Sequence, residues 1–200
     1  DETDYKELSK LYKAQKTSVG IVYIDNYDEL VQLIDDNLKS SVFAEVEQTL
    51  ATWMDPFNGI VRKYERDKFL VLFEAQYMDE FISSKFDLLD EVREINTGCD
   101  YHVTLSMGFG VDEENMIENH NSAKSAIEIA LGRGGDQAVV NTAGKYSFFG
   151  GKTVEMEKRN KVKSRVIAGV LKDLIDNCEN VLIMGHRNGD LDSIGAALGI

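Results

Sequence analysis

The chain has 200 residues, a hydrophobic content of 43% and a formal net charge of −13, which is enough apolar material for one complete core. No apolar stretch approaches the ~20 residues that a membrane span requires, and the first ten residues lack the layout of a signal peptide. The negative charge repels phosphate backbones on average, so nucleic acid is not expected as a partner. Cys99 and Cys178 stand apart without metal-ligand spacing, which excludes a disulfide scaffold and a zinc knuckle.

The first third of the chain is predicted to form a helix, a strand and more helix. Residues 4–16 carry apolar side chains at helical spacing, so they predict a helical connector that enters from something upstream. Residues 18–25 are an almost continuous apolar run rich in β-branched residues, which is typical of a central strand covered on both faces. Residues 28–54 are expected to be helical, in two pieces that divide near residues 35–41.

The middle of the chain begins with a hairpin. Residues 59–65 and 67–74 are two predicted strands separated by a very short charged turn. Apolar residues then recur at intervals of three and four over residues 78–95, which predicts one long amphipathic helix. Residues 101–111 predict a further strand.

The last part of this first domain is expected to be a helix over residues 122–131, ended by glycines, and short strands over residues 137–141 and 145–151. The predicted order interleaves strands with helices and contains an antiparallel hairpin. Such an order predicts an α/β fold in which helices pack against a mixed sheet, of the ferredoxin-like or nucleotide-cyclase kind.

The character of the chain changes after residue 151. Residues 152–180 are basic and then amphipathic, which predicts a linker helix, and residues 181–200 read as the first β-loop-α of a second domain. The expected organisation is therefore a connector over residues 1–16, a first domain over residues 17–151, this linker, and the start of another domain.

The stretch "RKYERDKFLVLFE" resembles the hairpin of GGDEF domains, the diguanylate cyclase fold, and the resemblance extends to about Gly151. The family uses turn glycines, which let the backbone approach a triphosphate, and carboxylates that hold Mg²⁺. This chain has Glu65 and Arg66 at the glycine positions, Lys68 at one metal-binding position and Tyr23 at the other. The resemblance thus implies a degenerate GGDEF-like domain without diguanylate cyclase activity.

Two interpretations of this hairpin stay open. In the first, it is a solvated charged turn with no role in binding. In the second, Asp25, Arg66, Asp67 and Lys68 line a vestigial nucleotide pocket that binds ATP with Mg²⁺. The second interpretation allows slow ATP hydrolysis, whereas the first leaves a nucleotide-independent spacer or dimerisation module.

A second candidate site lies in the loop after residues 181–184. His186, Asp190 and Asp192 lie between a predicted strand and a predicted helix, where α/β proteins commonly bind ligands. One imidazole and two carboxylates suit Mn²⁺, Fe²⁺ or Zn²⁺. The alternative is that Asp192 caps the helix, Asp190 is solvated, and His186 makes a strand-end hydrogen bond.

The string "IMGHRNGDLDSIGAALG" resembles the first motif of DHH phosphoesterases, which favours the metal-ligand interpretation of His186, Asp190 and Asp192. That family holds two metal ions, and its other ligands lie further along the chain. The resemblance therefore implies a two-metal site, expected to take Mn²⁺, that is incomplete within these 200 residues. The segment from about Val181 onward is expected to be mobile when its own domain is incomplete.

A degenerate GGDEF domain joined by a helix to a DHH motif resembles the cyclic-di-AMP phosphodiesterases of the GdpP type. Such proteins are anchored in the membrane and carry a PAS sensor before the GGDEF-like domain, which implies a cytoplasmic-side location for this chain. The implied function is a regulatory module that acts on a DHH domain hydrolysing cyclic-di-AMP, while the chain itself is expected to be inactive as a phosphodiesterase. A homodimer is a further expectation.

Overall fold

The computed structural model describes residues 2–151. The predicted linker helix over residues 152–180 lies outside the described residues, and so does the predicted second-domain start over residues 181–200 with its three candidate metal ligands. Within the described part, no helix is both long and apolar enough to cross a membrane.

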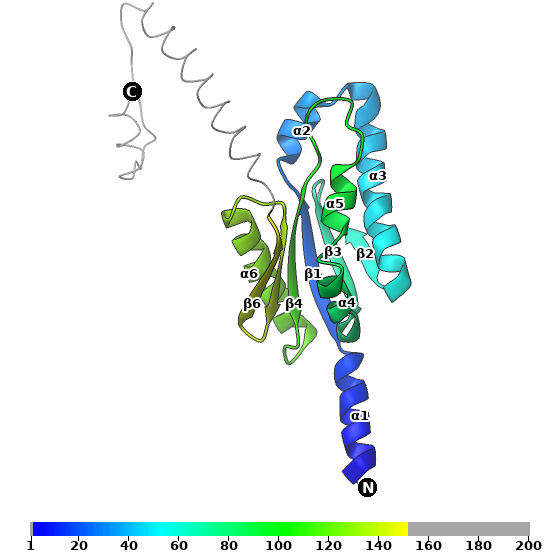
Figure 1. Cartoon of the computed structure of the whole chain (residues 1–200), viewed down its shortest axis with the longest axis vertical. Helices are drawn as coiled ribbons and strands as arrows, with labels where there is room; N and C mark the ends of the chain where they lie inside the picture. Colours follow the sequence, from blue (N-terminus) through cyan, green and yellow to red (C-terminus); the bar gives the residue numbers. More distant parts are fainter. Residues whose placement is uncertain (1, 152–200) are drawn as a thin grey trace, which may run out of the picture. The chain divides into compact units, whose positions relative to one another are not determined.

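Residues 2–151 build a six-stranded mixed sheet with the strand order β2-β3-β1-β4-β5-β6 (Figure 1). The strands are β1 (Thr17–Ile24), β2 (Ile60–Lys63), β3 (Lys68–Glu74), β4 (Leu105–Val111), β5 (Gln137–Thr142) and β6 (Lys145–Gly150). β4 and β5 are parallel, and the other neighbours are antiparallel. The prediction of an α/β fold with a mixed sheet is confirmed, including the β2–β3 hairpin.

The helices of the described part are α1 (Glu2–Ala14), α2 (Tyr27–Leu33), α3 (Asp36–Met54), α4 (Met78–Ser83), α5 (Leu88–Arg93) and α6 (Met116–Gly132), with short 3₁₀ turns at Asp55–Phe57 and Ala75–Tyr77. α1 extends away from the sheet ahead of β1, and four of the other helices cover the two faces of the sheet (Figure 1). α6 lies on one face, against β1, β4 and β5, while α3, α4 and α5 lie on the other (Figure 1). β1 is buried along almost its whole length because side chains on both of its faces are covered.

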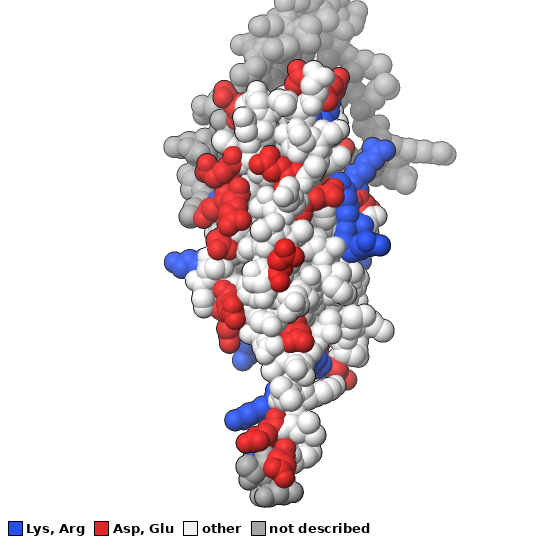
Figure 2. Space-filling view, turned by 90° about the vertical axis from the view of Figure 1, so that its right-hand side faces the viewer, with Lys and Arg blue, Asp and Glu red and all other residues white. Residues whose placement is uncertain are grey.

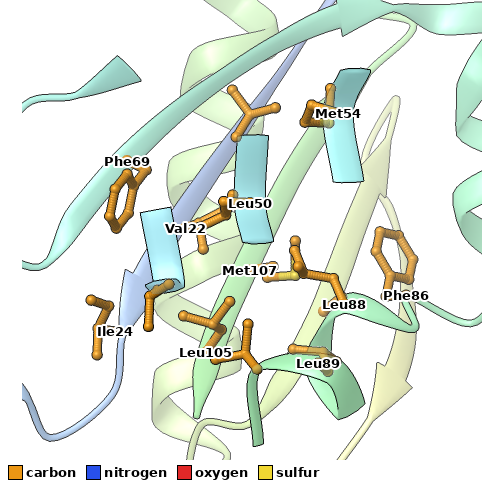
Figure 3. Close-up of a cluster of buried hydrophobic side chains, with 14 of the residues drawn as sticks. Val22, Ile24, Leu50, Met54, Phe69, Phe86, Leu88, Leu89, Leu105 and Met107 are labelled. Carbon is orange, nitrogen blue, oxygen red and sulfur yellow. The ribbon is translucent and has the colours of Figure 1, made fainter. Parts of the chain in front are cut away.

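The larger core lies between the sheet and α3, α4 and α5 (Figure 3). Val22 and Met107 come from the sheet, Leu50 from α3 and Leu88 from α5, and all four are fully buried. Aromatic rings extend this core, with the Phe86 ring centroid 5.1 Å from that of Phe109. Rings at such separations add stability beyond the area that they bury.

The smaller core lies under α6, where two glycines of β4 bring the helix unusually close. A Cβ atom at Gly108 would overlap the backbone of Ile127 and Ala123, and one at Gly110 would overlap the backbone of Asn119. The side chain of Asn119 also donates to the carbonyl of Thr17, 2.8 Å away, which ties α6 to the start of β1. The helix therefore rests directly on the strand backbone.

The region predicted as one helix over residues 78–95 is two helices, and that prediction is wrong in this respect. Lys85 and Phe86 both have positive φ angles, of 56° and 57°, which end α4 and redirect the chain. The amide of Phe86 donates to the carbonyl of Phe81 at 3.0 Å, as in a left-handed helix terminus. The turn places the Phe86 ring in the core, and the burial of this ring offsets the cost of the backbone conformation.

Candidate functional site

The tip of the β2–β3 hairpin is formed by Glu65, Arg66 and Asp67, which follow the last register pair of Lys63 with Phe69. The amides of Tyr64 and Glu65 both approach the carbonyl of Lys68, so the turn closes on itself. Arg66 is exposed at the tip, and Asp67 is half-buried beside it. The predicted hairpin residues Arg66, Asp67 and Lys68 are therefore brought together.

Tyr23 on β1 lies directly opposite Lys68 in the strand pairing. The Nζ atom of Lys68 is 5.1 Å from the centroid of the Tyr23 ring and 2.6 Å from a carboxylate oxygen of Glu65. These are the two positions at which a cyclase places metal-binding carboxylates, according to the resemblance described above. A cation over an aromatic ring is stable there without a metal, and the contact with Glu65 raises the pKa of Lys68.

Tyr64 adds a second aromatic hydroxyl to this corner. Partial burial and a hydrogen bond with Tyr23 both raise the pKa of Tyr64 above its ordinary value, with burial the larger cause. The Tyr64 phenol is consequently neutral at physiological pH. It offers a hydrogen-bonding group and a ring face, but it does not offer the negative charge that a magnesium ion prefers.

Four basic residues lie close together on the β2–β3 hairpin. Arg62, Lys63, Arg66 and Lys68 all belong to β2, β3 or the turn between them. Lys63 is bound to Glu47 at 2.5 Å, whereas Arg62 and Arg66 are exposed. Figure 2 shows a face on which acidic side chains are widespread and Lys and Arg side chains gather at one edge. An anionic ligand is attracted to such a basic group.

Asp25 directly follows β1 and is buried, with 8% of its surface exposed. One carboxylate oxygen accepts a hydrogen bond from the Ser106 hydroxyl at 2.6 Å. The other accepts from the Thr104 hydroxyl at 3.0 Å and from the Asp136 amide at 2.9 Å. Burial raises the pKa of Asp25, and the hydrogen bonds from Ser106, Asp136 and Thr104 oppose that shift. These contacts give Asp25 a structural role between β1, β4 and the turn after α6.

Asp136, whose amide bonds to Asp25, also binds Arg93 through its own side chain. It is 1% exposed, and its carboxylate receives Nε of Arg93 at 2.9 Å and Nη2 at 2.5 Å. Paired donors from one guanidinium fix a carboxylate in orientation as well as position. Sequence reasoning did not identify Arg93 or Asp136 as site residues, and the only local signal was the glycine pair that precedes Asp136.

The two groups of residues meet at the end of β1. The amide of Ile24 donates to the carbonyl of Asp67 at 2.8 Å, and the amide of Asp25 donates to the carbonyl of Thr104 at 2.9 Å. Ile24, which bonds to the hairpin tip, and Asp25, which carries the buried carboxylate, are thus consecutive residues at the end of β1. The proposed phosphate contacts remain on Arg66 and Lys68, because the Asp25 carboxylate is already engaged inside the domain.

Within residues 2–151, no cluster of three or more His, Cys, Asp or Glu side chains has an arrangement that could hold a metal ion. The predicted ligands His186, Asp190 and Asp192 lie outside that range.

Comparison with solved structures defines the class of this domain. The active GGEEF domain of a diguanylate cyclase from Vibrio cholerae matches with a TM-score of 0.54 and 12% sequence identity, covering 69% of this chain and 89% of that one. The coiled coil and GGDEF domain of DgcB from Caulobacter crescentus matches with a TM-score of 0.56 and 12% identity, covering 70% of this chain and 78% of that one. Residues 2–151 therefore have the GGDEF fold.

The particular family follows from sequence comparison. The family model described as "Cyclic-di-AMP phosphodiesterase GdpP-like, GGDEF domain" matches residues 22–148, and the chain belongs to this family. Over the whole chain it is 38% identical to the cyclic-di-AMP phosphodiesterase GdpP of Bacillus subtilis, and 37% identical to the cyclic-di-AMP phosphodiesterase PdeA of Listeria monocytogenes. The chain spans about 30% of the length of these relatives.

Proposed function

We propose that this chain is the regulatory GGDEF-like part of a longer cyclic-di-AMP phosphodiesterase. The observation that carries the proposal is its 38% identity to GdpP of Bacillus subtilis along the whole chain, which includes the segment after residue 151. In the proposed protein, the domain over residues 17–151 receives a signal from an upstream PAS sensor. It transmits this signal through residues 152–180 to a DHH domain that hydrolyses cyclic-di-AMP.

The proposed catalytic centre lies in the DHH domain and uses two manganese ions. His186, Asp190 and Asp192 would supply part of the ligand set, because an imidazole and two carboxylates suit Mn²⁺. When bound, such metals polarise the phosphate and generate a hydroxide nucleophile. The remaining ligands belong to the part of the protein that follows these 200 residues. Anchoring in the membrane belongs to the proposal as well, with this domain on the cytoplasmic side.

The contact between Tyr23 and Lys68 supports regulation over cyclisation. A cyclase needs carboxylates that hold Mg²⁺ against the triphosphate. Here a lysine ammonium lies 5.1 Å from the centre of a tyrosine ring at the corresponding positions. The bulky Glu65 and Arg66 also replace the small turn residues that let a backbone approach phosphate closely.

A second candidate function is slow ATP hydrolysis by the GGDEF-like domain itself. The exposed guanidinium of Arg66, beside Lys68 and Asp67, favours this candidate, since phosphate oxygens accept strong hydrogen bonds from such groups. In this alternative Asp67 would help to hold Mg²⁺. A nucleotide-independent dimerisation or spacer role would leave the same hairpin without a ligand.

The experiment that tests the main proposal measures cyclic-di-AMP hydrolysis by the full-length protein with Mn²⁺. Asp192→Ala should abolish turnover because it removes a proposed metal ligand, while residues 17–151 remain folded by circular dichroism. Glu179→Ala removes an acidic side chain outside the proposed ligand set, so turnover should persist. Full activity in Asp192→Ala, or no activity in the unmodified protein, would refute the proposed catalytic centre.

A further inference from the structure

Gly150 and Gly151 form the C-terminal end, or exit, of the GGDEF-like domain. This exit is hydrogen-bonded to Asp136, which also contacts Asp25 and Arg93. The amide of Gly151 donates to the carbonyl of Asp136 at 2.9 Å, and Gly150 pairs with Gln137 at the end of the sheet. We propose that Asp136 is a coupling residue, which joins this exit to the corner formed by the end of β1 and the β2–β3 hairpin through Asp25. This inference rests on the proposed regulatory function for its biological use.

Three hydrogen bonds and one covalent step, from Ile24 to Asp25, link the hairpin to the exit. The carbonyl of Asp67 at the hairpin tip accepts from Ile24, and Asp25 is the next residue of the same strand end. The Asp25 carboxylate accepts from the amide of Asp136, whose own carbonyl accepts from Gly151. Only one step uses a side chain, the short Asp25 carboxylate, and the others run through the backbone.

The backbone of Asp136 is held in a conformation that its contacts must maintain. Its φ angle is 54°, in the left-handed region that costs a side-chain-bearing residue free energy. The Arg93 guanidinium holds its carboxylate from one side, and Asp25 holds its amide from the other. Release of either contact removes part of what offsets this cost. Asp136 is therefore suited to change conformation when Asp25 moves.

Gly150, at the exit, is packed closely against Leu89 and Asp136, so it is expected to move when Asp136 moves. Gly150 has a φ angle of 83°, and a Cβ atom there would lie 2.8 Å from Leu89 on α5 and 3.2 Å from the Asp136 carbonyl. α5 carries Arg93 as well, so one helix contacts both Asp136 and Gly150. A shift of Asp136 consequently displaces Gly150 and Gly151.

The test compares amide hydrogen exchange in three variants of the 200-residue chain. Asp25→Ala removes the acceptor of the Asp136 amide, and exchange at Asp136 and Gly151 should accelerate about ten-fold more than exchange in α3. Asp25→Asn keeps a carbonyl acceptor and should restore most of the protection. Asp35→Ala, which removes the N-cap of α3, should change exchange at Asp136 and Gly151 no more than its effect on overall stability requires.

If the exit and the hairpin are coupled, a change at the exit should also affect the hairpin. This gives a second test, in which Asp25 is left unchanged. Gly150→Ala strains the exit, and it should accelerate exchange at Asp136 and at Ile24, whose amide bonds to the hairpin. Equal exchange at these two amides in the variant and the unmodified chain would overturn the coupling, as would a purely global effect of Asp25→Ala. If Asp25→Ala does not fold, the outcome for Gly150→Ala decides the matter.

The full-length protein separates this inference from the proposed function. If cyclic-di-AMP is not hydrolysed by the unmodified protein, the proposed function fails and the exchange data still decide the coupling. If it is hydrolysed, Asp25→Ala should change the rate by several-fold and Asp25→Asn should return it towards the original value. Amide exchange at Asp136 and Gly151 could accelerate in Asp25→Ala while both Asp25 variants hydrolyse cyclic-di-AMP at the same rate as the unmodified protein. That result would overturn the claim that Asp136 acts on the segment after residue 151.

Discussion

Asp25 illustrates how one side chain combines a large cost with several compensating contacts. Removing a carboxylate from water is unfavourable, and the charged form is retained only where hydrogen bonds replace the lost hydration. Three donors, from Ser106, Thr104 and Asp136, supply those bonds. If the carboxylate is deleted, all three donors lose their acceptor in the interior. Asp25→Ala should therefore cost about 2 to 5 kcal/mol in unfolding free energy, measurable by urea denaturation.

The raised pKa of Asp25 makes a prediction about pH. The pKa of Asp25 in the folded state lies above the unfolded value of about 3.9. Between these two pKa values, the Asp25 carboxyl therefore binds a proton more strongly in the folded protein than in the unfolded chain. The stabilisation from this group is fully present below the unfolded pKa and is lost as pH rises through the folded pKa. Relative to Asp25→Asn, which does not titrate, the unmodified chain should lose stability as pH rises above about 4. Parallel curves of unfolding free energy against pH for the two proteins would contradict this.

Arg66 carries the proposed contact with phosphate most directly, because it is exposed at the hairpin tip. If ATP binds there, Arg66→Ala should weaken binding about ten-fold or more, through loss of a charge-assisted hydrogen bond. Lys68→Ala should weaken it similarly, although Lys68 is also engaged by Glu65. Isothermal titration calorimetry measures both. Lys145→Ala makes the same charge change on β6, at the far edge of the sheet, and should leave affinity unchanged.

The residues that lie together were predictable where they are neighbours in the sequence. Arg66, Asp67 and Lys68 lie together because the short turn between β2 and β3 leaves them no alternative. The nucleotide pocket that they were expected to line with Asp25 stays a prediction. The partners of Asp25 were not predictable, since Asp136 lies 111 residues away and Arg93 reaches Asp136 across 43. Only the folded sheet and α5 bring those groups together.

At the scale of elements, α6 depends on two positions without side chains. Gly110→Ala would drive a methyl group into the backbone of Asn119, and neither backbone can move without disturbing the sheet or the helix. We expect a loss of about 1 to 3 kcal/mol or more in unfolding free energy, measured by chemical denaturation. A change smaller than 0.5 kcal/mol would show that α6 is not seated as closely as described.

Gly132 supplies the matched control. A Cβ atom there would meet nothing within 4 Å, so Gly132→Ala should leave stability unchanged or raise it by about 0.4 to 1 kcal/mol. If both alanine variants lost equal stability, the effect would belong to glycine replacement in general, and the close packing at Gly110 would not explain it.

The break between α4 and α5 shows why periodicity alone misplaced an element boundary. Apolar residues continue at helical spacing across Lys85 and Phe86, and neither residue is the glycine or proline that usually signals an end. The positive φ angles follow from packing, because Phe86 must enter the core beside Phe109. The start of α6 was also earlier than expected, at Met116, with Asn115 as its N-cap. The polar run over residues 118–121 separates Met116 and Ile117 from the apolar residues of the later turns and obscured the pattern.

For the whole molecule, α1 presents an unusual surface. Tyr5, Leu8, Leu11 and Tyr12 are between 53% and 74% exposed although they share one side of the helix. We predict that a second copy of α1 packs against this apolar side, because Tyr5, Leu8 and Tyr12 follow coiled-coil spacing. A contact formed by only about two helical turns from each chain is expected to be weak. Sedimentation equilibrium of the 200-residue chain should therefore show a weak, reversible dimer.

Leu8→Lys would place a charge in this seam and should weaken the dimer at least ten-fold. Lys10→Glu changes a charge on the opposite side of the helix and should leave it intact. A chain that remains monomeric at the highest accessible concentration, or a dimer indifferent to Leu8→Lys, would rule out the predicted α1 seam.

The fold of residues 17–151 was largely predictable because its strands have distinct patterns. β1 is mostly apolar and lies between β3 and β4, as expected of a central strand that is covered on both faces. The order of the strands in the sheet was not predicted, because it depends on pairings between segments far apart in the sequence. What the pattern could not supply was the close seat of α6 on β4, since glycines in a strand have several explanations.

We propose that this chain has a regulatory role in a longer phosphodiesterase and does not hydrolyse cyclic-di-AMP by itself. The most direct measurement is formation of the linear dinucleotide from cyclic-di-AMP with Mn²⁺, by the 200-residue chain and by the full-length protein in parallel. We expect turnover by the full-length protein and none by the chain, because the three predicted ligands His186, Asp190 and Asp192 are too few to hold two metals. Metal-dependent hydrolysis by the 200-residue chain would contradict it.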